Sequence, residues 1–81
     1  MPRTLSSARH KRLAELLIEY REQSDLTQTE VARSLRRYQP FISAIEAGQR
    51  RVDVVELLDI AKAIGFDPSE LLRRLQAVGP D

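Results

Sequence analysis

TQTEVARSLRRYQPFISAIEAG, residues 27–48, is the stretch that decides the fold of this chain. It opens on Thr27, followed three residues later by Glu30. This is the spacing of a capping box, in which each side chain satisfies a free backbone amide at a helix start. A helix is therefore expected from Thr27 to about Leu35, followed by a short turn that contains the Arg-Arg pair at 36–37.

The second half of the stretch predicts another short helix, over about 39–47. Pro40 suits the first turn of a helix, where its missing N–H costs nothing, and Gly48 suits the position just beyond the end. Ile42 and Ile45 point to one side of this helix. The opposite side has short, uncharged side chains: Gln39, Pro40, Ser43, Ala44 and Ala47. A solvated helix usually displays Lys and Glu, so this side is suited to a close approach to another molecule.

Three further helices are predicted around these two. They run from Ser6 or Ser7 to about Gln23, from the cap signal Asp53 and Glu56 to Gly65, and from the cap signal Asp67 and Pro68 toward Val78. No alternating run of β-branched residues predicts a strand. We therefore expect an all-α, compact five-helix bundle in which helices two and three form a helix-turn-helix. The expected organisation is a flexible basic N-terminal arm at 1–8, one domain at 9–78 and a tail at 79–81.

The expected core is small, because a domain of this length buries only about 60% of the surface of its unfolded chain. The fourth predicted helix has an unusually broad apolar face: Val54, Leu57, Leu58, Ile60, Ala61 and Ile64. The fifth adds Leu71, Leu72 and Leu75. Burial against a partner would increase the stability of such a domain.

The composition excludes several classes of function. The chain has no cysteine and a single histidine, His10, which leaves no thiolate site, no histidine cluster and no catalytic triad. Its three glycines lie far apart, which excludes a glycine-rich phosphate loop. We expect no catalytic residue, no metal, no cofactor and no small-molecule ligand. No apolar run approaches the roughly 18 residues of a membrane span, so we expect a cytoplasmic protein without a membrane partner.

The net charge of +1 conceals an asymmetry along the chain. Residues 1–51 contain 10 Lys and Arg against 6 Asp and Glu, a balance of +4. Residues 52–81 contain 3 against 6, a balance of −3. Because a basic surface attracts phosphates, the N-terminal part is expected to face a polyanion.

In combination, these features resemble the lambda-repressor-like, or Xre, helix-turn-helix family, from about Leu17 to Leu72. The residues that carry the resemblance are Arg21, Leu26, Thr27, Gln28, Glu30, Ala32, Ile42, Ser43, Ile45, Glu46, Gly48, Ile60, Ala61, Ala63, Ile64 and Gly65. The likeness includes single-domain phage-type repressors and restriction-modification controller proteins. Four positions depart from the family. Arg36 stands where Gly is usual, and Tyr38 stands where a Ser or Thr usually caps the next helix. Pro40 and Ala44 stand where relatives often have polar residues.

The resemblance implies that the helix at 39–47 lies in the major groove of DNA. The residues expected to contact base edges or thymine methyls are Gln39, Pro40, Phe41, Ser43 and Ala44. Gln39 is the leading base reader, because its amide offers a donor and an acceptor that match adenine N6 and N7. Two alternatives stay open, since Gln39 could be a solvated residue at a helix start and Phe41 could close the core.

The same resemblance implies a set of phosphate contacts. Gln28, the first residue of its helix, would bond a phosphate and brace Gln39. The other expected contacts are Thr27, Arg36, Arg37, Tyr38, Arg50, Arg51 and Arg12, with Arg3, Arg9 and Lys11 adding positive charge nearby. They would supply affinity rather than sequence preference, because phosphates carry no base information. Each arginine could instead be an ordinary solvated charge.

Two further roles are implied. The family pairs the arginine and glutamate that correspond to Arg21 and Glu46 as a partly buried bridge, so a structural ion pair is expected. One short helix reads too few base pairs for a regulator, so a homodimer on an inverted-repeat operator is expected as well. Its contact is expected through the last helix, at Leu72, Leu75 and Val78, although these residues could belong to the core instead.

The sequence therefore predicts a transcriptional regulator that binds double-stranded DNA, acting as a repressor or as a controller of its own gene. An antitoxin-like or other protein-interaction module is the first alternative, and a long disordered extension would indicate it. A small enzyme is the second alternative, but the chain shows no assembled acid, base or nucleophile.

Overall fold

The computed structural model describes residues 7–79, which contain five helices joined by short loops. They are α1 (Ala8–Gln23), α2 (Gln28–Ser34), α3 (Gln39–Glu46), α4 (Val54–Ile64) and α5 (Pro68–Gln76). Within these residues there is no strand, and no helix is long and apolar enough to cross a membrane. The prediction of an all-α five-helix fold is confirmed. Residues 1–6 of the expected N-terminal arm, including Arg3, and residues 80–81 of the expected tail lie outside the described part.

All the described helices except α3 begin at capping residues that the sequence indicates. In α2, the Thr27 hydroxyl accepts from the Glu30 amide at 3.1 Å, and the Thr27 amide donates to Glu30 Oε1 at 2.8 Å. Asp53 and Glu56 form the same reciprocal pair at the start of α4, at 2.7 and 3.1 Å. Local hydrogen bonding therefore sets where these two helices start.

The core lies between all five helices, and the buried residues that form it in the described part are apolar apart from one tyrosine hydroxyl. Its cluster comprises Leu16, Leu17, Tyr20, Val31, Ala32, Ile42, Ile45, Leu57, Ile60, Ile64 and Leu71. Tyr20 stacks on Phe66 with ring centroids 4.3 Å apart, and its hydroxyl donates to Glu70 at 2.6 Å. The hydroxyl of this buried ring is thus satisfied, while α1 is tied to the start of α5.

The apolar face of α4 is split rather than wholly buried, which corrects the sequence prediction for two residues. Leu57, Ile60, Ala61 and Ile64 are buried. Val54 and Leu58 are 72% and 51% exposed, and Val55, beside them, is 68% exposed. The reason is geometric, because α4 packs against α2 and α5 over an arc that is narrower than its apolar arc.

The turn between α2 and α3 requires an unusual backbone conformation. Arg36 has φ of +58°, in the left-handed region that glycine tolerates best. The turn is closed by a hydrogen bond from the Arg37 amide to the Ala32 carbonyl at 2.9 Å. The turn geometry therefore persists without the glycine that is usual in the resembled family, at a backbone cost of roughly 1–2 kcal/mol. α3 then begins at Tyr38, whose side chain makes no cap hydrogen bond.

The chain offers a direct test of the α5 packing in two adjacent leucines. Leu71 is fully buried, whereas Leu72 is 48% exposed. Leu71→Ala should lower the free energy of unfolding by about 2–5 kcal/mol, because it leaves a cavity in the core. Leu72→Ala should cost less than about 1 kcal/mol in the monomer. Urea unfolding at low protein concentration measures both, and equal losses would show that the register of α5 is wrong.

Candidate nucleic-acid interface

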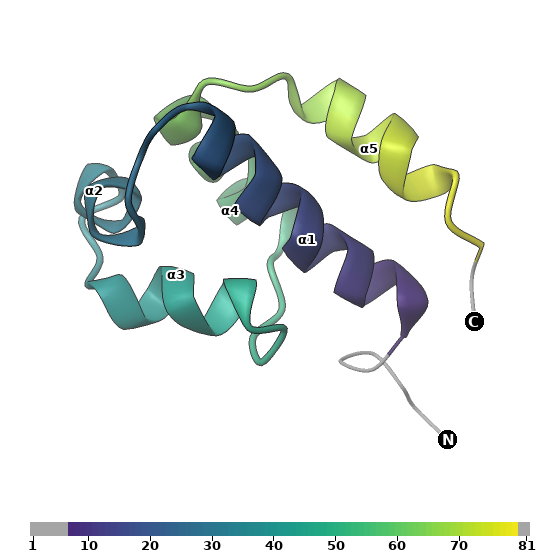
Figure 1. The fold of residues 1–81 in the computed structure, drawn as a ribbon, viewed down its shortest axis with the longest axis horizontal. Helices are drawn as coiled ribbons and strands as arrows, with labels where there is room; N and C mark the ends of the chain where they lie inside the picture. The colour runs from purple at the N-terminus through teal and green to yellow at the C-terminus, as the bar shows by residue number, and fades with distance from the viewer. Residues whose placement is uncertain (1–6, 80–81) are drawn as a thin grey trace.

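The outer side of α3 is only partly covered by the rest of the described fold. α3 lies at one edge of the molecule beside α2, on the opposite side of α1 from α5 (Figure 1). Ile42 and Ile45 are buried and anchor the helix, while Gln39 and Pro40 at its start are exposed. Ser43 and Ala44 are partly buried, so the surface they offer is shallow. Because the two buried isoleucines hold one side of α3 against the core, the opposite, uncharged side faces outward.

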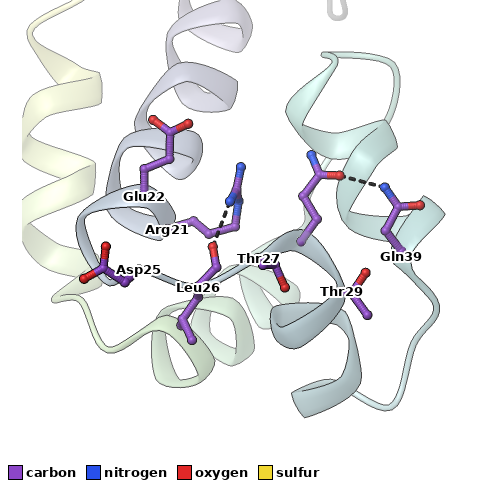
Figure 2. A pocket seen from close by; sticks show the side chains of 8 residues that line it. Arg21, Glu22, Asp25, Leu26, Thr27, Thr29 and Gln39 are labelled. Carbon is purple, nitrogen blue, oxygen red and sulfur yellow. Dashed lines mark hydrogen bonds between the residues drawn. The ribbon is translucent and has the colours of Figure 1, made fainter.

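Gln39 is held by a second glutamine. Its Nε2 donates to Gln28 Oε1 at 2.7 Å, the bond drawn between α3 and α2 in Figure 2. Gln28 Nε2 in turn donates to Glu46 Oε1 at 2.8 Å. The exposed Gln39 amide is therefore bonded to Gln28 of α2, which is itself held by Glu46, and its orientation is restrained before any ligand binds.

Glu46 is the inner end of this arrangement and pairs with Arg21. Arg21 Nε donates to Glu46 Oε2 at 2.6 Å and Nη2 donates to Oε1 at 3.0 Å. Arg21 Nη1 also donates to the Leu26 carbonyl at 2.8 Å (Figure 2). The two side chains are 13% and 7% exposed, and the carboxylate raises the pKa of Arg21 above its usual value. The pair thus joins α1 to the end of α3 through two parallel, charge-assisted bonds.

An open depression lies where the end of α1 meets the starts of α2 and α3. It is lined by Arg21, Glu22, Asp25, Leu26, Thr27, Gln28, Thr29 and Gln39 (Figure 2). Thr27 uses its hydroxyl oxygen to cap α2, and Gln28 is only partly exposed. The carboxylates of Glu22 and Asp25 lie on the α1 side of this depression. A polyanion is therefore disfavoured on the α1 side of the depression.

Phe41 lies between the core and two arginines. It packs against the core cluster, while the guanidinium carbons of Arg37 and Arg50 lie 4.4 and 4.6 Å from its ring centre. Arg50 also binds the Glu56 carboxylate through two bonds, at 3.0 and 2.8 Å. Phe41 thus serves as a platform for two cations as well as a cover for the core. A phosphate at Arg50 would have to share this guanidinium with Glu56.

The other predicted phosphate contacts differ in their surroundings. Arg36, Arg51 and Tyr38 are exposed, Tyr38 to 88%. Arg12, on α1, pairs with Glu15 at 3.1 Å. The described structure therefore leaves the cations of the turn and Arg51 of the loop after α3 accessible, while Arg12 and Arg50 are already paired.

The residues predicted for the dimer contact fall into two groups. Leu72 is exposed, whereas Leu75 packs against the core and Val78 is partly buried. The Val78 carbonyl accepts from Arg9 Nε at 3.1 Å and from Nη2 at 2.6 Å, which ties α1 to the end of α5. Reasoning from the sequence missed this contact, because nothing in the local pattern around Arg9 indicates a partner 69 positions away.

Two further features were also missed. His10 Nε2 lies 3.3 Å from the Gly48 carbonyl, so α1 meets the loop after α3. On α4, Val54, Val55 and Leu58 form an exposed apolar surface that could serve an interface. The sequence did contain a signal for this α4 surface, because the apolar arc of the helix is too wide to be buried against one neighbouring helix. Within residues 7–79, no group of three or more His, Asp or Glu side chains is placed to hold a metal ion.

Comparisons with known proteins identify helix-turn-helix relatives by sequence and by structure. Residues 12–75 match a family described as a helix-turn-helix domain. An XRE-family like protein from Pseudomonas syringae pv. tomato is 44% identical, with a TM-score of 0.81, and the match covers 86% of this chain and 85% of that chain. No curated protein sequence matches significantly.

Two other solved structures are similar. The restriction-modification controller protein C.AhdI from Aeromonas hydrophila is 30% identical with a TM-score of 0.73, over 79% of this chain and 93% of that one. The clp gene regulator ClgR from C. glutamicum shares the fold with a TM-score of 0.77, over 85% of this chain and 90% of that one, at 22% identity.

The Arg50–Glu56 pair makes stability depend on pH in acid. The hydrogen bond from Arg50 is the main cause that lowers the pKa of Glu56 from 4.5 to about 2, and the Asp53 amide adds to it. A lowered pKa in the folded state stabilises the fold above pH 4.5, and this contribution is lost as the pH falls toward 2. Glu56→Gln should lower the free energy of unfolding at neutral pH by about 1 kcal/mol, because the pair lies near the surface.

Urea unfolding from pH 7 to pH 2 measures this contribution, and the variant should show a flatter curve between pH 4.5 and 2. Glu15→Gln is the matched control, since Glu15 pairs with Arg12 at an exposed position where such pairs contribute little. If the free energy of unfolding of Glu56→Gln fell between pH 4.5 and 2 as steeply as that of the parent protein, Glu56 would not be the source of the acid dependence.

Proposed function

Since the chain belongs to the Xre-like helix-turn-helix family of DNA-binding regulators, we propose that it controls transcription by binding an inverted-repeat operator as a homodimer. The observation that carries the proposal is the exposed, uncharged outer side of α3, with Gln39 already oriented by Gln28. The major groove of DNA admits an α-helix of this kind. The proposed site of action is the cytoplasm.

In the proposed complex, the start of α3 reads base edges. Gln39 offers a hydrogen-bond acceptor and a donor to one adenine, because one of its N–H groups remains after the bond to Gln28. Pro40, Ser43 and Ala44 provide a low surface that lets the helix approach. Phe41 sits at the edge of this surface and could contact a thymine methyl while it supports Arg37.

Affinity comes from the basic groups around α3. The proposed phosphate contacts are Gln28, Thr27, Arg36, Arg37, Tyr38, Arg50, Arg51 and Arg12. The positions of these residues support the proposal, because most of them lie in the turn before α3 or in the loop after it. The exposed arginines among them are accessible to a phosphate backbone.

Two copies of α3 are needed, because one short helix contacts only a few base pairs. Half-sites about 34 Å apart on one face of DNA require a two-fold symmetric pair. We propose that α5 supplies the contact, with Leu72 at its centre and Leu75 and Val78 at its edges. The exposed apolar side of α4 is the competing surface. Repression or self-regulation is the proposed mode, and one structural relative is named a restriction-modification controller.

Gln39→Ala tests the base reader. It should weaken binding to the preferred site by about 1–3 kcal/mol and relax the preference at one base pair of each half-site. Selection from random duplex DNA identifies the site, and titration against single-base variants of that site measures the effect. Arg51→Gln is the contrast, since it should weaken binding to all sequences alike and reduce the slope of log K against log salt by about one. An unchanged base preference in Gln39→Ala would refute the assignment.

Two equally exposed leucines decide the dimer surface. Leu72 on α5 is 48% exposed and Leu58 on α4 is 51% exposed, so a glutamate at either position should be tolerated by the monomer fold. Leu72→Glu should shift the protein to a monomer in sedimentation equilibrium and weaken binding to an intact operator. Leu58→Glu should leave the dimer in place. The reverse result would move the interface to α4, and a monomeric parent protein would exclude the proposed dimer.

A further inference from the structure

A continuous series of side-chain hydrogen bonds runs from the interior to the outer end of α3. Arg21 of α1 donates twice to Glu46 at the end of α3. Glu46 Oε1 accepts from Gln28 Nε2 at 2.8 Å, and Gln28 Oε1 accepts from Gln39 Nε2 at 2.7 Å. The series therefore connects a carboxylate that is 7% exposed with an exposed amide on the surface proposed to meet DNA.

Chemistry decides which end of each amide points which way. A carboxylate has no hydrogen to donate, so Gln28 can satisfy Glu46 only with its NH2 group. The Gln28 oxygen then faces Gln39. Because an amide oxygen can only accept, Gln39 must donate to it with its own NH2 group. If Gln28 were turned by half a rotation about its last bond, its oxygen would face a carboxylate oxygen.

The outcome is a fixed pattern on the exposed amide. Gln39 keeps its oxygen free to accept and one N–H free to donate, at defined positions in space. Arg21 maintains the pattern from the other end, because its two parallel bonds hold the carboxylate in one orientation. The pattern therefore originates at a charge that Gln39 does not touch.

We infer that Glu46 is a positioning residue that determines base specificity, because its carboxylate fixes the donor and acceptor ends of the Gln39 amide through Gln28. The inference rests on the proposed function and deepens it. An acceptor and a donor in this order are complementary to adenine N6 and N7, whereas an amide free to take both orientations discriminates less.

Glu46→Gln tests the inference, because it keeps the shape of the side chain and supplies an NH2 group. Oε1 of Glu46 accepts from Arg21 Nη2 and Gln28 Nε2, and Oε2 accepts from Arg21 Nε. In either orientation the new NH2 group therefore faces an Arg21 N–H and one Arg21 bond is lost, so the variant no longer fixes the Gln28 amide, or the Gln39 amide beyond it, in one orientation. Discrimination at the base pair read by Gln39 should fall roughly 5- to 150-fold, the range of one bidentate contact. Titration against four duplexes that differ at this base pair gives the measurement.

A role that is only structural predicts a different result. If Glu46 merely held α3 in place, Glu46→Gln would weaken binding to all four duplexes equally and leave their ranking unchanged, which would overturn the inference. Glu56→Gln is the matched control, because it makes the same change at another arginine-paired carboxylate outside the series. Its ranking of the four duplexes should equal that of the parent protein.

Gln28→Ala gives an independent arm if circular dichroism shows that Glu46→Gln does not fold. It removes the link but leaves the Arg21–Glu46 pair intact. Overall affinity should fall through the lost phosphate contact, and the ranking at the Gln39 base pair should also flatten. A ranking that survives in Gln28→Ala would overturn the inference.

A measurement without DNA separates this inference from the proposed function. In doubly labelled free protein, a scalar coupling across the hydrogen bond should join Gln39 Nε2 to the Gln28 side-chain carbonyl carbon, and it should weaken in Glu46→Gln as the Gln28 amide loses its single orientation. A coupling of unchanged size in the variant would overturn the inference. A parent protein that shows this coupling but selects no sequence from random duplex DNA would instead refute the proposed function.

Discussion

Glu46 imposes the constraint on which the arrangement of this protein depends. Its carboxylate is almost removed from water, so it requires donors that the fold must place within reach. Arg21 comes from α1 and Gln28 comes from α2, and both satisfy it at the end of α3. Because a misplaced helix would leave a buried charge without partners, the pair restricts how α1 and the helix-turn-helix can sit relative to each other.

The hydrophobic contacts and this polar series act on the same helix in different ways. Ile42 and Ile45 hold α3 to the core, but apolar packing is not directional and would tolerate small rotations of the helix. The hydrogen bonds at Glu46 and Gln39 are directional and restrain the rotation that remains. A helix presented to a groove requires both restraints, since its outer side must meet base edges at defined positions.

The turn between α2 and α3 shows how much strain the fold accepts for this arrangement. Arg36 adopts a left-handed conformation that glycine tolerates best, and the bond between the Arg37 amide and the Ala32 carbonyl closes the turn nonetheless. Tyr38 begins α3 without a side-chain cap. The burial of Ile42 and Ile45 therefore compensates for the strained backbone of Arg36 and for the missing cap at Tyr38.

Local physics was readable in the sequence. Capping boxes at Thr27 and Asp53 and the helical spacing of apolar residues specified the five helices, because these effects depend on residues three or four positions apart. The sequence also determined that the outer side of α3 is uncharged. The ion pair of Arg21 with Glu46 was expected through a family resemblance rather than from spacing.

Tertiary structure alone decided the rest. The contact of Arg9 with the Val78 carbonyl, the two arginines on Phe41, and the exposure of Val54 and Leu58 depend on which faces of distant helices meet. The apolar arc of a helix does not determine how much of that arc a neighbouring helix will bury. Likewise, the ends of an amide become distinguishable only when a fixed charge stands beside it, and folding brings that charge to Gln28 from 18 positions away.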